Sequence, residues 1–141
     1  MRPILRLLPL LGLLPVAASF AGDLTVRIEQ VRSDRGSVLA ALYASEATYM
    51  NPPTARATFK VRARAGGVEY VFRNLAAGQY ALSVFHDEND NGVLDRNPFG
   101  IPREGYGFSN HAQGTRGPPV FGRAAFAFDG TLKTITITLR Y

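Results

Sequence analysis

The segment from Asp87 to Asp95 places oxygen-bearing side chains at the spacing of an acidic calcium loop. In such a loop, oxygen ligands stand at positions one, three, five and nine, glycine at position six permits a sharp turn, and position seven contributes its main-chain carbonyl. Every one of these positions is suitably filled, so the segment predicts a site for one calcium ion. The predicted ligands are Asp87, Asn89, Asn91, the carbonyl of Val93 and Asp95.

The twelfth position departs from a helix–loop–helix calcium site. That site has a bidentate Glu there, whereas this chain has Pro98 and shows no helical pattern on either flank. We predict that Glu104 supplies the missing carboxylate by folding back, with Asn97 as a second candidate. The alternative is a solvated turn without metal, because Asp and Asn are good turn formers that tolerate left-handed backbone angles.

Neighbouring residues have types suited to proton transfer. His86 beside Asp87 is a candidate pair of base and carboxylate, but the sequence places no nucleophile or second base with it, and the chain has no Cys. A buried or capping histidine is the preferred interpretation, and no catalytic residue is assigned. A carboxylate-dependent hydrolase built on Asp87, Asp95 and Glu104 stays open as an alternative.

Two aromatic residues, Tyr106 and Phe108, are candidate binding residues. Their rings can stack on a sugar or a protein partner, and the alternative is that they anchor their own loop. From His86 to about Pro119 the alternating pattern stops, and glycines and prolines gather. Long loops in compact domains are functional or disordered, and the aromatic content here favours a loop that folds back over the end of the domain.

The rest of the chain predicts the strands that position this loop. Apolar and polar residues alternate in segments 24–29, 55–65, 68–73, 79–86, 124–128 and 133–141, and segment 37–44 is apolar on both faces. With turn residues between them and no helical period, these segments predict an all-β fold. We expect an antiparallel two-sheet sandwich of about seven strands, immunoglobulin-like or prealbumin-like, with one long Gly/Pro-rich loop. A closed barrel is the alternative.

Two glycine-containing turns predict hairpins. Gly66-Gly67 is expected to pair the strands on either side of it, and Asp129-Gly130 is expected to form a terminal hairpin. The intervening threonines of the last strand are expected to face outward. The residues predicted to face the core of that hairpin are Phe126, Phe128, Ile135, Ile137 and Leu139.

The N-terminal segment has the pattern of a secretory signal. Basic residues Arg2 and Arg6 precede an apolar run that ends in small residues, and this run is broken by Pro9 and Pro15 and is too short to span a membrane. We predict a signal peptide over residues 1–21 and a single domain over residues 22–141. The mature protein is expected in the periplasm or outside the cell, and not as an integral membrane protein.

The net charge and the composition limit the classes of partner that we expect the protein to bind. Removing Arg2 and Arg6 from the sixteen Lys and Arg leaves fourteen against eleven Asp and Glu, a net charge of +3. This charge is too small to predict nucleic-acid binding. The basic residues of segment 56–64 have the pattern of a charged outer face or a protected edge strand. The remaining expectation is a non-catalytic module that binds an envelope polysaccharide or protein, or a structural accessory protein without a ligand.

The runs from Phe72 to Ala81, from Val84 to Asp95 and from Gly100 to Asn110 carry a family resemblance. They resemble the exported bacterial domain of unknown function numbered 2141, and the similarity covers nearly all of the chain after residue 21. The resemblance implies a sandwich fold and export, and the family has no assigned activity. In outline the chain is also similar to prealbumin-like sandwiches. Their periplasmic hydrolase ends in Tyr-Arg-Gly-Ser, which this chain lacks, so its activity is not carried over.

Signal cleavage is predicted after Ala21. A signal peptidase recognises small residues at the two positions that Ser19 and Ala21 occupy in an extended segment. N-terminal sequencing of the protein from the cell envelope or the medium should therefore begin at Gly22. A protein that begins at Met1 and needs detergent for its extraction would contradict the prediction.

Overall fold

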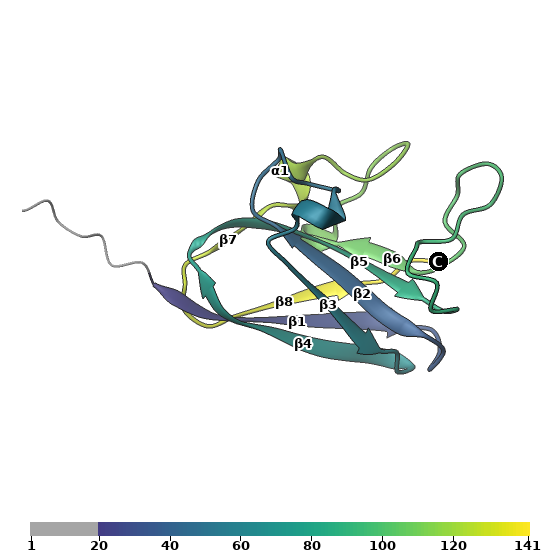
Figure 1. Cartoon of the computed structure of the whole chain (residues 1–141), viewed down its shortest axis with the longest axis horizontal. Helices are drawn as coiled ribbons and strands as arrows, with labels where there is room; N and C mark the ends of the chain where they lie inside the picture. Colours follow the sequence, from purple (N-terminus) through teal and green to yellow (C-terminus); the bar gives the residue numbers. More distant parts are fainter. Residues whose placement is uncertain (1–19) are drawn as a thin grey trace, which may run out of the picture.

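The structure is a computed structural model that describes residues 20–141, so most of the predicted signal segment lies outside the described residues. Within residues 20–141 the chain forms two β-sheets with little helix (Figure 1). None of the helices in this part is long and apolar enough to cross a membrane. The strands are β1 (Ala21–Val31), β2 (Ser37–Tyr43), β3 (Ala57–Arg62), β4 (Gly66–Ala76), β5 (Gly78–Asp87), β6 (Tyr106–Phe108), β7 (Phe126–Phe128) and β8 (Lys133–Thr138). The helical turns are η1 (Pro52–Thr54), η2 (Ser109–His111) and α1 (Phe121–Ala124).

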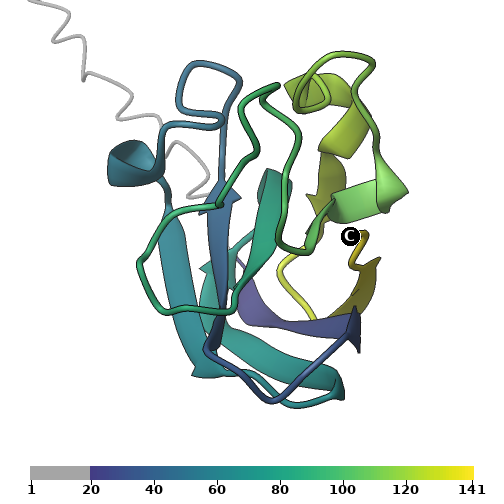
Figure 2. The same cartoon turned by 90° about the vertical axis from the view of Figure 1, so that its right-hand side faces the viewer.

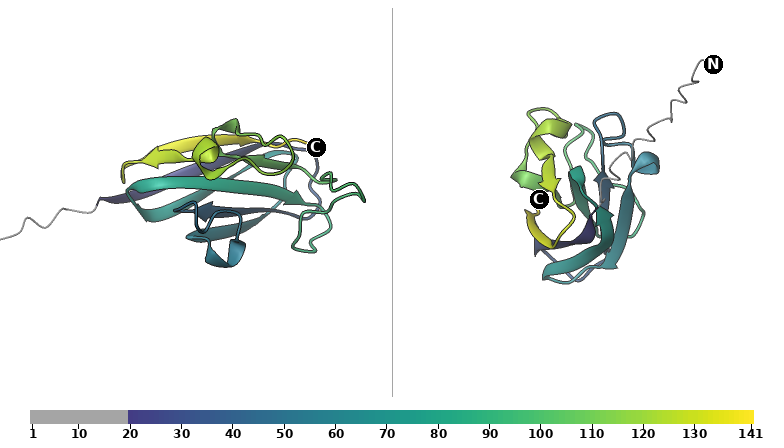
Figure 3. Two further views of the ribbon diagram at one scale, coloured as in Figure 1. Left: turned by 90° about the horizontal axis from the view of Figure 1, so that it is seen from above. Right: turned by 90° about the vertical axis from the view of Figure 1, so that its left-hand side faces the viewer.

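The two sheets confirm the predicted all-β sandwich. One sheet has the order β4-β1-β8, and the other has the order β3-β2-β5-β6, with β7 also paired to β5. The views in Figure 3 show the strands of both sheets arranged around a shared interior. Most neighbouring strands are antiparallel, as predicted, but β1 and β8 run parallel, from the pair Leu24 and Lys133 to the pair Glu29 and Thr138.

Neither of the predicted hairpins forms, so both predictions are wrong. The Gly66-Gly67 turn leads from β3 in one sheet to β4 in the other, and the Asp129-Gly130 turn leads from β7 to β8, which also lie in different sheets. Glycine at positive φ permits a tight change of direction, with φ of 94° at Gly66 and 81° at Gly130. The turn sequence does not determine which strands pair, because strand pairing depends on which apolar faces are buried between the sheets.

The core lies between the sheets and confirms most of the predicted register. Leu24, Val26 and Ile28 alternate inward along β1, and β2 is buried along nearly its whole length between β3 and β5. On β7 and β8, Phe126, Phe128 and Ile137 are buried as predicted, and so is Leu139 directly after β8. Ile135 is only half-buried and packs against the edge of this core, which corrects the prediction for that residue.

A second, smaller apolar cluster covers the outer face of β5. Ala81, Phe108 and Ala124 are its buried members, and Tyr49 and Phe121 pack against them. Because Ala81 alternates with Leu82 along β5, the strand is buried on both faces. Ala112, Phe121 and Ala124, which follow β6, therefore cover this face of the sheet.

We predict that truncating Ile137 strongly destabilises the protein. Ile137 is fully buried in the core, so Ile137→Ala should lower the free energy of unfolding by about 2 to 5 kcal/mol through lost apolar contact and a residual cavity. Thr134→Ala, at an exposed position of the same strand, should cost less than about 1 kcal/mol. Urea unfolding monitored by circular dichroism measures both. Equal losses in the two variants would mean that the register is wrong.

Candidate functional site

The candidate site lies in the loop between β5 and β6. The two strands are antiparallel neighbours, with Ser83 opposite Phe108 and Phe85 opposite Tyr106, so the loop of residues 88–105 leaves and returns at the same end of the sandwich. The main-chain N–H of His86 donates to the carbonyl of Gly105 at 2.7 Å and closes the base of the loop. Figure 2 looks at this end and shows the loop crossing in front of the strand ends.

The chain winds around the carboxylate of Asp87. This side chain is 0% exposed and accepts the main-chain N–H groups of Asn91 at 3.1 Å and Gly92 at 2.7 Å. Farther along, Asn89 Oδ1 accepts the N–H of Asn91 at 3.2 Å, and Asn91 Oδ1 accepts the N–H of Val93 at 3.0 Å. The alternate side chains that were predicted to be ligands thus form one coil of short turns, with φ of 57° at Asp90 and 81° at Gly92.

Asp95 joins this coil through the two asparagine amides. Asn89 Nδ2 donates to Asp95 Oδ2 at 2.7 Å, and Asn91 Nδ2 donates to Asp95 Oδ1 at 3.0 Å. Hydrogen bonds therefore bring together the side chains of Asn89, Asn91 and Asp95 and tie them to the turn that Asp87 organises. Val93 has an exposed side chain and takes part in the turn through its main chain.

Glu104 closes the loop from the other side. Its side chain is almost fully buried, and its carboxylate accepts the main-chain N–H of Glu88 at 2.8 Å and that of Asp95 at 2.9 Å. The remote carboxylate thus contacts the backbone at both ends of the acidic segment. The side chain of Asn97, the second candidate, accepts the N–H groups of Phe99 and Ile101 in a turn of its own.

The acidic residues of the loop fall into two groups: the first has cationic partners, and the second does not. Glu88 pairs with Arg32, and the hydrogen bond between them raises the pKa of Arg32. Asp90 accepts the Ser37 hydroxyl at 2.7 Å and lies 3.2 Å from Lys60 Nζ, and these contacts lower the pKa of its carboxyl group. No Lys, Arg or His of residues 20–141 forms an ion pair with a member of the second group. That group is Asp87, Asp95 and Glu104.

The carboxylates of Asp87, Asp95 and Glu104 accept hydrogen bonds only from neutral N–H groups. Each carboxylate oxygen offers two lone pairs, and the main-chain and amide N–H donors described above leave part of that capacity unused. Within the described residues, no three side chains of Asp, Glu or His come together as a metal-ligand group. A hard cation bound here would therefore take oxygens from the asparagine amides or the main chain in addition to the carboxylates.

His86 belongs to a separate network behind the loop. Its ring is fully buried, and Nε2 lies 2.7 Å from the carbonyl oxygen of Arg35, which can only accept, so Nε2 carries the proton. Nδ1 then accepts the Tyr141 hydroxyl at 2.8 Å, and that hydroxyl accepts the Arg32 N–H at 3.0 Å. Burial of the hydroxyl raises the pKa of Tyr141. Asp87 directs its carboxylate into its own turn, so the sequence pair of base and carboxylate does not form.

Several residues that brace the loop were missed by sequence reasoning. Arg32, Ser37, Lys60 and Tyr141 all contact it or its base. These residues are distant from the loop in sequence, so no periodicity or motif in the sequence indicates the contacts. Gly105 is the one residue of the loop whose type relates to these contacts, because a Cβ atom there would overlap the ring of Tyr141.

The two predicted aromatic binding residues have different environments. Phe108 is buried among Ala81 and Ala124 on the outer face of β5. Tyr106 is half-buried at the start of β6, with its ring edge-on to Phe108 at a centroid distance of 6.3 Å. Both residues lie in a short strand and not in an irregular loop, which corrects the prediction that the strand pattern stops until Pro119.

Comparison with protein families identifies the group to which this fold and loop belong. A family model described as "Uncharacterized protein conserved in bacteria (DUF2141)" matches residues 26–136. The chain belongs to this family. The matched segment includes every predicted calcium ligand, and the resemblance noted in the sequence is confirmed. Neither the comparison with curated proteins nor that with solved structures gives a match, so the immunoglobulin-like or prealbumin-like outline stays a prediction.

We predict that Glu104→Gln loosens the loop. An amide offers one acceptor oxygen where the carboxylate offered two, so one of the N–H groups of Glu88 and Asp95 loses its partner, at a cost of about 1 to 3 kcal/mol. Melts in chelator and amide hydrogen exchange at these two N–H groups measure the effect. Glu46→Gln removes the same charge at an exposed position and is the matched control. Unchanged exchange in Glu104→Gln would show that Glu104 does not close the loop.

Proposed function

We propose that the mature chain is an exported, non-catalytic module that binds one calcium ion in the loop of residues 87–104. The observation that carries this proposal is the clustering of Asp87, Asn89, Asn91 and Asp95 by their turn hydrogen bonds, next to a buried Glu104. None of the carboxylates of Asp87, Asp95 and Glu104 forms an ion pair with a cationic side chain among the described residues. A divalent cation is the partner that would neutralise them.

The loop conformation supports calcium because it already holds the turns that a calcium loop needs. Asn89 Oδ1 and Asn91 Oδ1 each accept one N–H and keep one lone pair. A cation that replaces the two amide N–H groups as the partner of Asp95 can use those lone pairs after a small side-chain rotation. Calcium tolerates six to eight oxygens in irregular geometry, whereas magnesium requires a tight octahedron and keeps its water. The irregular donor set here therefore favours calcium.

The second candidate is an envelope-associated accessory protein that needs no ligand. It is favoured by the observation that each oxygen of Asp87 and Glu104 already accepts a main-chain N–H, so the loop closes without metal. The same contacts argue against the carboxylate-dependent hydrolase, because these oxygens are directed at backbone donors and not at His86, whose two ring nitrogens are also paired.

Export remains part of the proposal. A protein cleaved after Ala21 begins at Gly22, inside β1 and one residue past the start of that strand. The pairing of β1 with β4 and β8 from Leu24 onward is retained in that mature chain. The periplasm or the extracellular medium supplies calcium at concentrations suited to a weak site, since extracellular calcium modules bind at about 10⁻⁴ to 10⁻³ M.

We expect calcium to raise the melting temperature of the mature domain. At about ten times the dissociation constant the stabilisation is RT ln 11, roughly 1.4 kcal/mol, which corresponds to a shift of about 3 to 7 °C. The measurement is a thermal melt in millimolar calcium, in magnesium and in chelator, with metal content determined on the same samples. Magnesium should give the smaller shift.

Asp95→Asn and Asp87→Asn test whether the shift comes from this loop. Both variants should lose most of the calcium-dependent shift, even if their melting temperatures in chelator also change, because the readout is the difference between the two conditions within each variant. Glu46→Gln, which removes one exposed carboxylate elsewhere, should keep the full shift. A wild-type protein with no calcium-dependent shift would leave the accessory protein as the function.

A further inference from the structure

A groove of about 400 Å³ lies where the edges of the two sheets meet, away from the acidic loop. Its floor is formed by β6 and the residues that follow β8, and the segment after η2 forms its wall. The polar residues that line it are Gln30, Tyr106, His111, Gln113, Thr138 and Arg140. Its volume falls in the range of about 300 to 1,000 Å³ that small-ligand pockets occupy.

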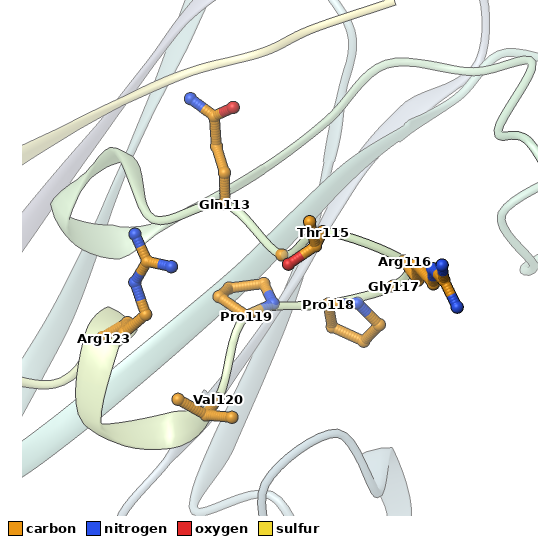
Figure 4. Close-up of a pocket in the computed structure, with 9 residues that line it drawn as sticks. Gln113, Thr115, Arg116, Gly117, Pro118, Pro119, Val120 and Arg123 are labelled. Atoms are coloured by element: carbon orange, nitrogen blue, oxygen red, sulfur yellow. The ribbon is translucent and has the colours of Figure 1, made fainter.

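The groove continues into a second hollow of about 310 Å³ inside the segment of residues 113–123. Gln113 and two glycines line both spaces, so the two hollows are neighbours. Figure 4 shows Gln113 and Arg123 projecting to the same side of this segment, with Arg116 at its far tip and Pro118 and Pro119 along its wall. An extended ligand can therefore contact both parts.

The walls of the groove are anchored to the sandwich. Ser109 Oγ accepts the N–H of Leu82 at 2.9 Å and donates to the carbonyl of Ala124, and Asn110 Nδ2 donates to the carbonyl of Ala125 at 2.6 Å. The floor is fixed by the paired main chains of Tyr106 and Arg140, with both N–H donors 2.9 Å from their acceptors. The site is therefore held in shape by contacts that do not use its lining side chains.

Three non-glycine residues with left-handed backbone gather at this groove. Gln30 has φ of 60°, Asn110 has 58° and His111 has 50°. Such conformations are costly for side-chain-bearing residues and cluster at ligand sites, where the surrounding structure imposes them. Gln30 and His111 are both lining residues, so two residues with hydrogen-bonding side chains have this constrained backbone at the groove.

The charge of the groove has one sign. Arg116, Arg123 and Arg140 line its two parts, and no Asp or Glu of the described residues is among the lining. None of these three guanidinium groups has an ion pair within residues 20–141. Arginine binds carboxylate through two parallel hydrogen bonds, so the groove has donors for an anionic group and no competing acid.

We propose that this groove binds an acidic oligosaccharide, with the carboxylates of two uronic-acid units on Arg140 and Arg123. Neutral polar residues such as Gln30, Gln113 and Thr138 match sugar hydroxyls, and the half-buried ring of Tyr106 and the exposed Pro118 offer apolar surface to the faces of sugar rings. A phosphate would use the arginines but leave those amides and the tyrosine without a role. The assignment is independent of the calcium site, because no lining residue belongs to the loop of residues 87–104.

The test titrates trigalacturonate into the mature domain by calorimetry, in chelator so that calcium bound to the sugar plays no part. Wild type should bind, and Arg140→Gln and Arg123→Gln should each weaken binding by about tenfold or more through loss of a charge-assisted bond. Arg64→Gln removes the same charge from an exposed site after β3 and should bind as wild type does. The methyl ester of the same trisaccharide should bind more weakly than the acid.

Three results would overturn the proposal. Absence of trigalacturonate binding, or equal binding by wild type and both groove variants, would show that the groove is not the site. Equal affinity for inorganic phosphate or for triglutamate would show a general anion surface in place of a saccharide site. Circular dichroism and a melt of each variant accompany the titrations, so that loss of binding in a folded protein is distinguished from loss of fold.

Discussion

The carboxylate of Asp87 sits fully buried at the end of β5, and a buried charge is tolerated only when donors or cations meet it. The donors to this carboxylate come from the backbone. The residues after Asp87 turn back so that the N–H groups of Asn91 and Gly92 donate to its two oxygens. This requires left-handed backbone at Asp90 and Gly92. Gly36 must also lack a side chain, because a Cβ there would overlap the Asp87 carbonyl oxygen. The shape of the acidic loop follows from this one buried group.

Sequence reasoning succeeded where the determining interactions are local. The alternation of Leu24, Val26 and Ile28 fixes which face of β1 is buried, and the spacing of Asp87, Asn89 and Asn91 fixes a run of turns that involves only neighbours. It failed for partners distant in sequence. Asp129-Gly130 permits a sharp change of direction, but nothing local tells β8 to pair in parallel with β1. In the same way, no local sequence pattern indicates that Arg32 forms an ion pair with Glu88 or that Lys60 forms one with Asp90.

Strand β6 separates the two regions to which we assign binding roles. On one side it ends the acidic loop, with Glu104 two residues before its first residue. On the other it forms the floor of the basic groove through Tyr106 and its pairing with Arg140. Gly107 lets this short strand lie close to β8, since a Cβ would come within 2.7 Å of the Ile137 side chain. The acidic loop and the arginine-lined groove are thus both attached to this strand without sharing a side chain, and we propose a separate ligand for each.

The parallel pairing of β1 with β8 has a consequence for the order in which the molecule acquires structure. β1 is the central strand of its sheet, and one of its two neighbours comes from the other end of the described chain. The sheet therefore stays incomplete until residue 138 is available, however early the other strands have been made. Pairings between such distant segments close large loops and form slowly. For a chain exported as we propose, slow completion of this sheet leaves time for export before the fold is complete.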